Sequence, residues 1–254
     1  MAAAEPSIDA LGQFKLDTAL GALGASVNFT NSNFMMLVAG GLILALLYFG
    51  MRPKAIIPGR LQALAEIAYD GIYSMCHEQI GHEGRAYFPF IFTLFFFVMF
   101  GNLLGLLPFT FTYTSHIAVT FGLALIVIVV ATVVALRIHG WKFFTYFFPE
   151  GAPKALAPII IPVEVISYLS RPISLSIRLC ANMVAGHVMF EVFASFIVMM
   201  AASSMLGHFG IVAAIGPMAL NVILMGFELL VAFLQAYVFA ILTCIYLHDA
   251  VHLH

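Results

Sequence analysis

Charged side chains are scarce in this chain of 254 residues. Asp, Glu, Lys and Arg together make up 9% of it, whereas apolar residues make up 63%. An ordinary soluble domain is about 45–50% apolar and about 25% charged. The chain therefore has too little polar material to cover a water-facing surface. This excludes a soluble globular protein and a disordered or fibrous one, and leaves an integral membrane protein.

Cysteine is also rare, and the formal net charge is only −2. Cys76, Cys180 and Cys244 lie far apart in the sequence, so they indicate neither a disulfide framework nor a metal cluster, and buried structural thiols are favoured. Without a basic excess, the composition gives no reason to expect nucleic-acid binding.

Two motifs that would point to an enzyme are missing from the sequence. It contains no G-x-x-x-x-G-K-[ST] nucleotide-binding loop. It also lacks H-E-x-x-H, the mark of an intramembrane metalloprotease, because Gly81 and Ala86 stand where the second histidine would follow His77 and His82. We therefore expect no nucleotide, cofactor or metal in this chain.

Long apolar runs dominate the sequence instead. A bilayer core needs about 20 helical residues to cross it, and the stretches 34–51, 88–107 and 117–136 each fit one crossing. The stretches 159–206 and 217–247 are longer than one perpendicular crossing requires, which steep tilt accommodates.

These runs predict an all-α integral membrane protein with five transmembrane helices. Only a short loop joins the last two spans, so we expect them to form a long, tilted, antiparallel hairpin. The expected organisation is a polar extracytoplasmic tail over 1–33, followed by a single membrane domain over 34–254.

The segment 60–80 has a different pattern, because apolar and polar residues alternate at helical spacing. It is too polar to span a bilayer and is predicted to lie in the interface. Its apolar positions are Leu61, Leu64, Ala65, Ala68, Ile72 and Met75, and its polar ones are Gln62, Glu66, Asp70 and Ser74.

Basic residues are distributed unequally between the two sides of the predicted membrane. Segments on the side of the N-terminus hold one, Lys15, and those on the opposite side hold seven. Basic residues favour the cytoplasmic side. The N-terminus is therefore predicted outside and the C-terminus in the cytoplasm.

Polar groups of the fourth predicted span fall on two opposite faces. At about 100° per residue, four residues lie within about 40° of Arg178: Glu164, Arg171, Ser174 and Asn182. His187 and Glu191 lie on the other side of the helix. A single straight pore would not need polar groups on opposite faces, whereas two separate access routes would.

The last predicted span carries its own polar stripe, since Asn221, Glu228 and Gln235 follow one another at intervals of seven residues. Because the two spans run antiparallel, one register pairs Arg178 with Gln235 and also brings His187 level with Glu228.

Structural explanations remain open for several of these side chains. Asn221 and Ser174 are equally well explained as interhelical hydrogen-bonding groups. Glu191 fits the headgroup region, and Glu164 and Arg171 fit long side chains that reach the cytoplasmic interface. Arg178 resists such an explanation, because it stands 20 residues into its span among apolar neighbours, where charge is costly.

At this point the residues resemble a known family. The motif Ser174-Leu-Ser-Ile-Arg178-Leu-Cys-Ala-Asn182-Met-Val-Ala-Gly186-His187 is similar to the signature of subunit a of the F-type ATP synthase. Asn102-Leu-Leu-Gly-Leu-Leu-Pro108 resembles an earlier motif of that family, and Leu234-Gln235-Ala-Tyr-Val-Phe239 followed by Tyr246 resembles its C-terminal one. The resemblance covers nearly the whole chain, in order.

The resemblance implies a stator subunit with two offset proton half-channels beside a rotating ring of subunit c. It also implies subunit b of the peripheral stalk, the remaining subunits of the complex and the lipid bilayer as partners. Protons are the expected coupling ion. The implied location is a bacterial inner membrane, and the mitochondrial inner membrane is the alternative.

The resemblance also implies roles for single residues. Arg178 matches the essential arginine of the family, and Glu164 matches a carboxylate on the cytoplasmic route. Four residues match polar positions on the outer route and beside the arginine: Asn182, His187, Glu228 and Gln235. Ser174, Asn221 and Tyr246 complete the expected proton path. Some bacterial members place the acid and the histidine the other way round, so this chain follows the mitochondrial and related bacterial pattern.

A self-contained ion channel or carrier is the competing interpretation. It would need a complete path within this chain, and the opposed polar faces without a central carboxylate favour a partner that supplies the middle step. The C-terminal His248, His252 and His254 have the spacing of a metal site, but an exposed cytoplasmic tail is the favoured explanation.

Overall fold

The computed structural model describes residues 30–51, 59–107, 110–148, 156–202 and 208–252. Within these ranges every element of regular structure longer than one residue is helical. The six α-helices are α1 (Asn31–Met51), α2 (Arg60–Ile80), α3 (Phe88–Gly105), α4 (Ile117–His139), α5 (Ala157–Ala202) and α6 (His208–Val251). Three short 3₁₀ helices accompany them: η2 (His82–Ala86), η3 (Tyr113–Ser115) and η4 (Gly140–Phe147).

Five of the described helices are long and apolar enough to cross a membrane, namely all but α2. This confirms the predicted all-α architecture with five helices that are capable of crossing a membrane. Almost all of the expected N-terminal tail, 1–33, lies outside the described residues.

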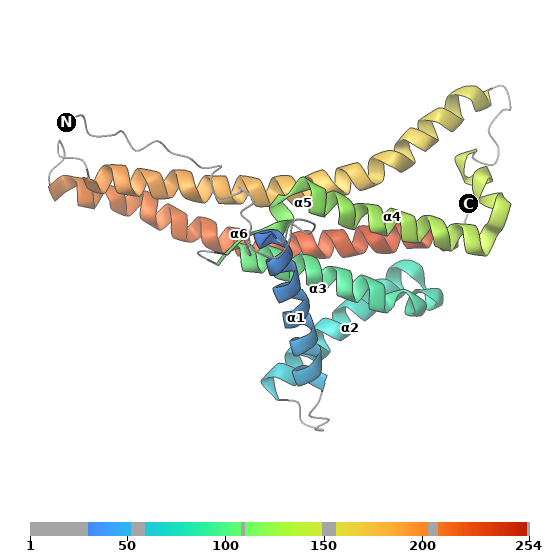
Figure 1. Ribbon diagram of the computed structural model, residues 1–254, viewed down its shortest axis with the longest axis horizontal. Coiled ribbons are helices and arrows are strands. Elements are labelled where there is room, and N and C mark those ends of the chain that lie inside the picture. Colours follow the sequence, from blue (N-terminus) through green and yellow to red (C-terminus); the bar gives the residue numbers. More distant parts are fainter. Residues whose placement is uncertain (1–29, 52–58, 108–109, 149–155, 203–207, 253–254) are drawn as a thin grey trace, which may run out of the picture.

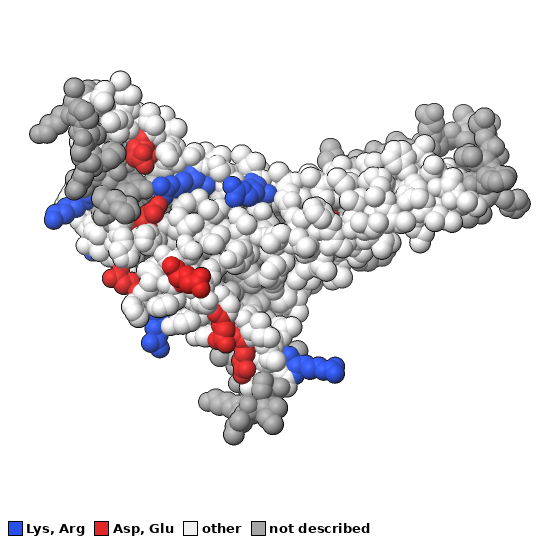
Figure 2. All heavy atoms as spheres, turned by 180° about the vertical axis from the view of Figure 1, so that it is seen from behind, with Lys and Arg blue, Asp and Glu red and all other residues white. Residues whose placement is uncertain are grey.

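The two longest helices, α5 and α6, pack side by side over the left and central part of Figure 1, and the N-terminal end of α5 diverges from α6 towards the right. α4 packs on α5, and α3 packs on α6, so both lie against the same half of the long pair. α1 and α2 lie farther out (Figure 1). On the face in Figure 2, charged side chains gather over the part of the molecule where the other helices cover α5 and α6. The part where α5 and α6 project beyond the other helices is almost free of charge on this face.

The helix that contains the last predicted span begins earlier than that span. We expected the span to begin at Pro217, but α6 begins at His208 and Pro217 lies inside the helix. α5 likewise contains Pro162 and Pro172. A proline removes one backbone hydrogen bond, and a helix in apolar surroundings can tolerate that loss where neighbouring groups compensate.

Glycines end two of the helices that frame the bundle. Gly81 follows α2 with φ +83° and Gly140 follows α4 with φ +56°. Only glycine adopts such positive φ values readily, so both positions stop a helix cleanly. At Gly81 the backbone N–H still donates to the carbonyl of His77.

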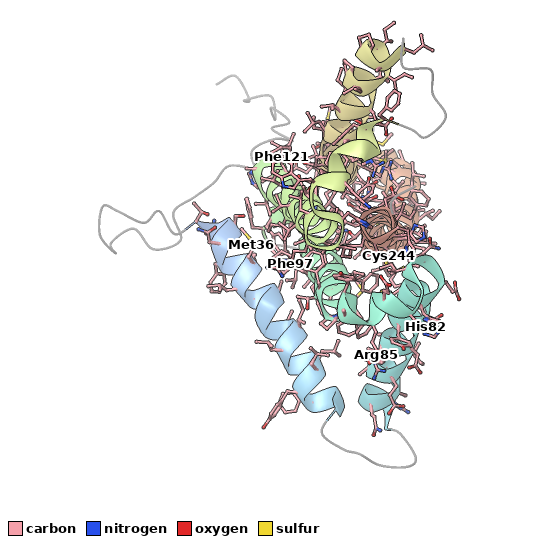
Figure 3. All side chains as sticks on the ribbon, turned by 90° about the vertical axis from the view of Figure 1, so that its right-hand side faces the viewer. Met36, His82, Arg85, Phe97, Phe121 and Cys244 are labelled. Carbon is pink, nitrogen blue, oxygen red and sulfur yellow. The ribbon has the colours of Figure 1, made fainter. Side chains whose placement is uncertain are left out.

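Two of the three cysteines meet in the interior of the bundle. The Sγ atoms of Cys76 on α2 and Cys244 on α6 are 3.8 Å apart, and both thiols are buried. Figure 3 shows Cys244 within the bundle. The thiol of Cys180 is half-buried and donates to the carbonyl of Ser115 over 2.9 Å. The prediction of buried structural thiols is thus confirmed for Cys76 and Cys244, and their contact ties α2 to α6.

Part of the connection between α3 and α4 packs into the bundle, because residues 112–115 are buried. Tyr113 is inaccessible to solvent, and its hydroxyl donates to the carbonyl of Phe97 over 2.6 Å. Its ring lies against the Cα of Gly101, on α3. The segment therefore packs into the bundle because a glycine leaves room for an aromatic ring.

We expect Gly101→Ala to destabilise the protein. The added methyl group would lie 2.5 Å from the ring of Tyr113, and overpacking of this kind costs about 1–3 kcal/mol. The measurement is the midpoint of thermal unfolding in detergent. Gly122→Ala is the matched control, because its methyl group would meet nothing within 4 Å and alanine is the better helix former. Equal midpoints for the two variants would contradict this account of the packing.

Candidate functional site

Arg178 lies on an exposed face of α5. Leu175, Leu179 and Met183 point into the bundle and are buried, whereas Arg178 and its neighbour on the same face, Ala181, are exposed. No hydrogen bond or ion pair joins Arg178 to any residue that the structure describes. A permanent positive charge is therefore presented on the outside of the bundle, where a partner can reach it.

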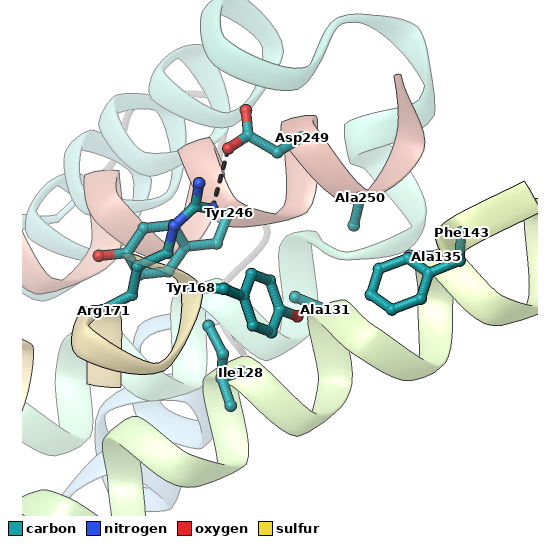
Figure 4. Close-up of a pocket in the computed structure, with 9 residues that line it drawn as sticks. All are labelled: Ile128, Ala131, Ala135, Phe143, Tyr168, Arg171, Tyr246, Asp249 and Ala250. Carbon is teal, nitrogen blue, oxygen red and sulfur yellow. Dashed lines mark hydrogen bonds and ion pairs between the residues drawn. The ribbon is translucent and has the colours of Figure 1, made fainter. Parts of the chain in front are cut away.

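Arg171 differs from Arg178, although it is only two helical turns away. Its Nη1 lies 3.0 Å from Oδ2 of Asp249 on α6. Its guanidinium carbon lies 5.5 Å from the ring centre of Tyr168 and 5.3 Å from that of Tyr246 (Figure 4). The ion pair and the two cation–π contacts hold it between α5 and α6.

The interpretation of Arg171 as a side chain that merely reaches the interface is therefore incomplete, because its partner is another side chain of this chain. Its side chain is 21% exposed and that of Asp249 is 29% exposed. Tyr246, expected on the proton path, stands beside Arg171 in this cluster. The cavity that these residues line is only about 10 Å³, which is room for about one water molecule.

Glu228 of α6 meets α5 at Gly186. Its side chain is 8% exposed, and a Cβ added to Gly186 would collide with the carboxylate. Neither carboxylate oxygen has a hydrogen-bond partner among the described residues. The predicted register, which brought His187 level with Glu228, agrees with this contact because Gly186 directly precedes His187.

His187 connects α5 to the segment between α3 and α4. Its Nε2 lies 2.9 Å from the hydroxyl of Thr112. It also borders an open cavity of about 460 Å³, together with Asn221 of α6 and Thr110. Three expected site residues, His187, Glu228 and Asn221, thus lie in one region of the α5–α6 pair.

Gln235 is 7% exposed, and its Nε2 has no hydrogen-bond partner among the described residues. One turn earlier on α6, the carbonyl of Ala232 accepts a hydrogen bond from Nδ2 of Asn102 over 3.2 Å. No hydrogen bond joins Gln235 to Arg178 in the described part of the chain, so the pairing of these two residues stays a prediction.

The remaining expected residues are spread along α5. Glu164 and Asn182 are half-buried and Ser174 is exposed. No hydrogen bond within the described ranges connects them to the group around His187 and Glu228. Their proposed place on a proton path therefore rests on their position along the helix.

Several residues of the site were missed by reasoning from the sequence. Thr112 stands in an irregular segment, where no periodicity indicates what a side chain contacts. Gly186 carried no signal either, because its role is to leave room for Glu228. Asp249 could have been found, since it is the only acidic residue after Glu228 and a membrane arginine needs a partner.

Comparisons with known proteins match this chain over nearly its whole length to one family. A family model described as ATP synthase A chain matches residues 33–248. The ATP synthase subunit a of Granulibacter bethesdensis is 68% identical over 252 residues, which are 99% of this chain and 100% of the relative. The protein of the same name from Gluconacetobacter diazotrophicus is 64% identical over 249 residues, or 98% and 99%. That of Rhodospirillum rubrum is 47% identical over 231 residues, or 91% and 92%.

Proposed function

Because this chain belongs to the ATP synthase A chain family, we propose that it is the stator subunit a of an F-type ATP synthase. In this role it provides two offset proton half-channels beside a rotating c-ring and couples proton translocation to rotation. It binds no nucleotide itself, and ATP is made elsewhere in the complex.

The observation that carries this proposal is that Arg178 is exposed on α5 and makes no hydrogen bond or ion pair with any described residue. Guanidinium stays protonated at physiological pH, so Arg178 cannot pass protons along. It instead attracts a ring carboxylate that has lost its proton, and its fixed charge blocks a direct leak between the half-channels. Each proton that crosses a potential of about 100 mV releases about 2.3 kcal/mol. Rotation of the ring adds up the free energy of several such crossings.

The outer half-channel runs through the open cavity beside His187 and Asn221. Histidine titrates near neutral pH, so His187 is suited to a relay or to holding water. Glu228 lies deeper, against Gly186, and Asn182 and Gln235 lead from there towards Arg178. The cytoplasmic half-channel uses Glu164, Ser174 and Tyr246.

The proposed partners, membrane and orientation of the chain follow from its proposed role as the stator subunit. α5 and α6 form a tilted antiparallel hairpin against the c-ring, α2 lies in the interface, and subunit b of the peripheral stalk binds elsewhere on the chain. The apolar helices and the bacterial relatives support a bacterial inner membrane rather than a mitochondrial one. The N-terminus is placed outside and the C-terminus in the cytoplasm.

Purification of the tagged chain in mild detergent, with a mass census of the bound subunits, tests the assignment. We expect a small proteolipid in stoichiometric excess together with the soluble nucleotide-binding subunits. A chain that purifies alone, or only with copies of itself, would refute the stator role and favour a self-contained channel or carrier.

A pair of variants shows whether the proteolipid binds the face that carries Arg178. Ala181→Trp adds bulk to that exposed face and should lower the recovery of the proteolipid several-fold. Ala118→Trp is the matched control, since Ala118 is also exposed but lies on α4. Equal losses in the two variants would place the ring against another surface.

A further inference from the structure

Thr112 is a buried polar residue that the proposed proton path does not include. It is 5% exposed and stands in the segment between α3 and α4, just before η3. Its hydroxyl is 2.9 Å from Nε2 of His187, on a different helix and 75 residues later in the chain. The contact therefore joins an irregular segment to the side chain that borders the open cavity.

The surroundings of Thr112 hold it firmly in place. Its side chain sits against the Cα of Gly105 on α3, where any Cβ would collide with it. Its carbonyl accepts a hydrogen bond from the hydroxyl of Ser115 over 2.6 Å. The carbonyl of Ser115 in turn accepts a hydrogen bond from the thiol of Cys180, two turns before His187 on α5. The hydroxyl of Thr112 is thus fixed relative to the helix that carries His187.

We propose that Thr112 is a positioning residue for His187, and that its hydroxyl sets the orientation of the imidazole ring in the outer half-channel. This inference rests on the proposed function, because it assumes that His187 lies on a proton path. Thr112 itself carries no proton across the membrane in this scheme.

The chemistry of the two groups suits this role. A neutral imidazole has one nitrogen that donates and one that accepts, and a hydroxyl can do either. The hydroxyl of Thr112 can donate to a bare Nε2, and it can accept from Nε2–H after the ring gains a proton. One contact therefore supports the ring both before and after protonation. Without it, the ring loses the contact that directs its Nε2 towards this hydroxyl.

Titratable groups stand on each of the three elements that meet at His187. Glu228 of α6 lies against the preceding residue, Gly186, and Glu191 stands one turn farther along α5. The segment that carries Thr112 also contains His116, whose ring stacks on that of Phe111 at 5.1 Å. Burial holds the pKa of His116 below its usual value, so it is neutral at pH 7.

The test compares Thr112→Val with Thr112→Ser in the whole ATP synthase complex, reconstituted into vesicles. Valine keeps the shape but loses the hydroxyl, whereas serine keeps the hydroxyl. We expect Thr112→Val to lower proton flux about three- to tenfold, the factor that one hydrogen bond contributes, and to shift its pH profile. Thr112→Ser should retain the wild-type profile. Identical profiles for the valine variant and wild type, or equal losses in both variants, would overturn the proposal.

Two further measurements keep the result decisive. Thr132→Val is the matched control, because the hydroxyl of Thr132 lies 2.6 Å from that of Tyr168 on α5, away from the cavity beside His187. The pH profile of proton flux in this variant should match that of the wild type.

In the unmutated complex, ¹⁵N resonances should show His187 in one fixed tautomer. An averaged pair of tautomers would reject the proposal even if Thr112→Val does not assemble. Arg178→Ala in the same vesicles distinguishes failure of this inference from failure of the proposed function. If that variant stops ATP-coupled proton transport and Thr112→Val does not lower it, only the role of Thr112 fails.

Discussion

Replacing Arg178 by alanine is expected to abolish proton-driven ATP synthesis while the complex still assembles. The side chain is exposed and makes no hydrogen bond or ion pair within the described part of the chain, so its removal breaks no internal contact. Exposed substitutions of this kind usually change the free energy of unfolding by less than about 0.5 kcal/mol. The proposed gate, however, depends on that one permanent charge.

The matched comparison is Arg171→Ala, which removes the same side chain two turns away. Here the loss leaves Asp249 without the ion pair of 3.0 Å, and a hydrogen bond to a charged group contributes about 1.5–3 kcal/mol. We therefore expect lower thermal stability but retained coupling in the complexes that assemble. Synthesis in inverted vesicles and unfolding in detergent are the two measurements. Normal synthesis by Arg178→Ala would refute the gate.

The second large effect is expected from Gly186→Ala. The added methyl group would collide with the buried carboxylate of Glu228, so that either the carboxylate must turn away or α5 and α6 must separate. Overpacking costs about 1–3 kcal/mol. If the substitution destabilises the arrangement of α5 and α6 that transports protons by this amount, proton flux drops by about tenfold or more. The flux is measured in vesicles that contain the complex.

A second substitution tests whether Glu228 is the reason. Glu228→Asp shortens the side chain by one methylene group and makes room for the new methyl, so the double variant should transport faster than Gly186→Ala alone. Gly226→Ala is the control on α6, because its methyl group would meet nothing within 4 Å. If Gly226→Ala were as damaging as Gly186→Ala, or if aspartate brought no relief, the contact with Glu228 would not explain the effect.

Much of the α5–α6 arrangement follows from the sequence, because helical periodicity determines which residues share a face. The intervals between Asn221, Glu228 and Gln235 predicted a stripe on α6, and the antiparallel register predicted that Glu228 lies level with His187. The contact between Glu228 and Gly186 agrees with that register. Local spacing suffices here, because two long helices that pack side by side can slide only in steps set by their side chains.

Partners that come from elsewhere in the chain could not be predicted in the same way. Thr112 meets His187 from an irregular segment, and Cys76 meets Cys244 although 168 residues separate them. Such contacts depend on how the helices are placed around one another, which local spacing does not specify. Pro217 shows a different limit of local preference, since a residue that often starts a helix lies inside α6 here.

The sequence by itself therefore determined the class of protein, the five apolar helices, the polar stripes and the likeness to a family. Composition and periodicity are enough for these, because the bilayer demands long apolar helices and charge at that depth is costly. Only the tertiary structure decided which charges are satisfied. It pairs Arg171 with Asp249 and leaves Arg178 exposed, although both arginines stand on the same face of the same helix. The reason is that α6 ends beside Arg171 and supplies the partner there, whereas the face around Arg178 lies outside the bundle.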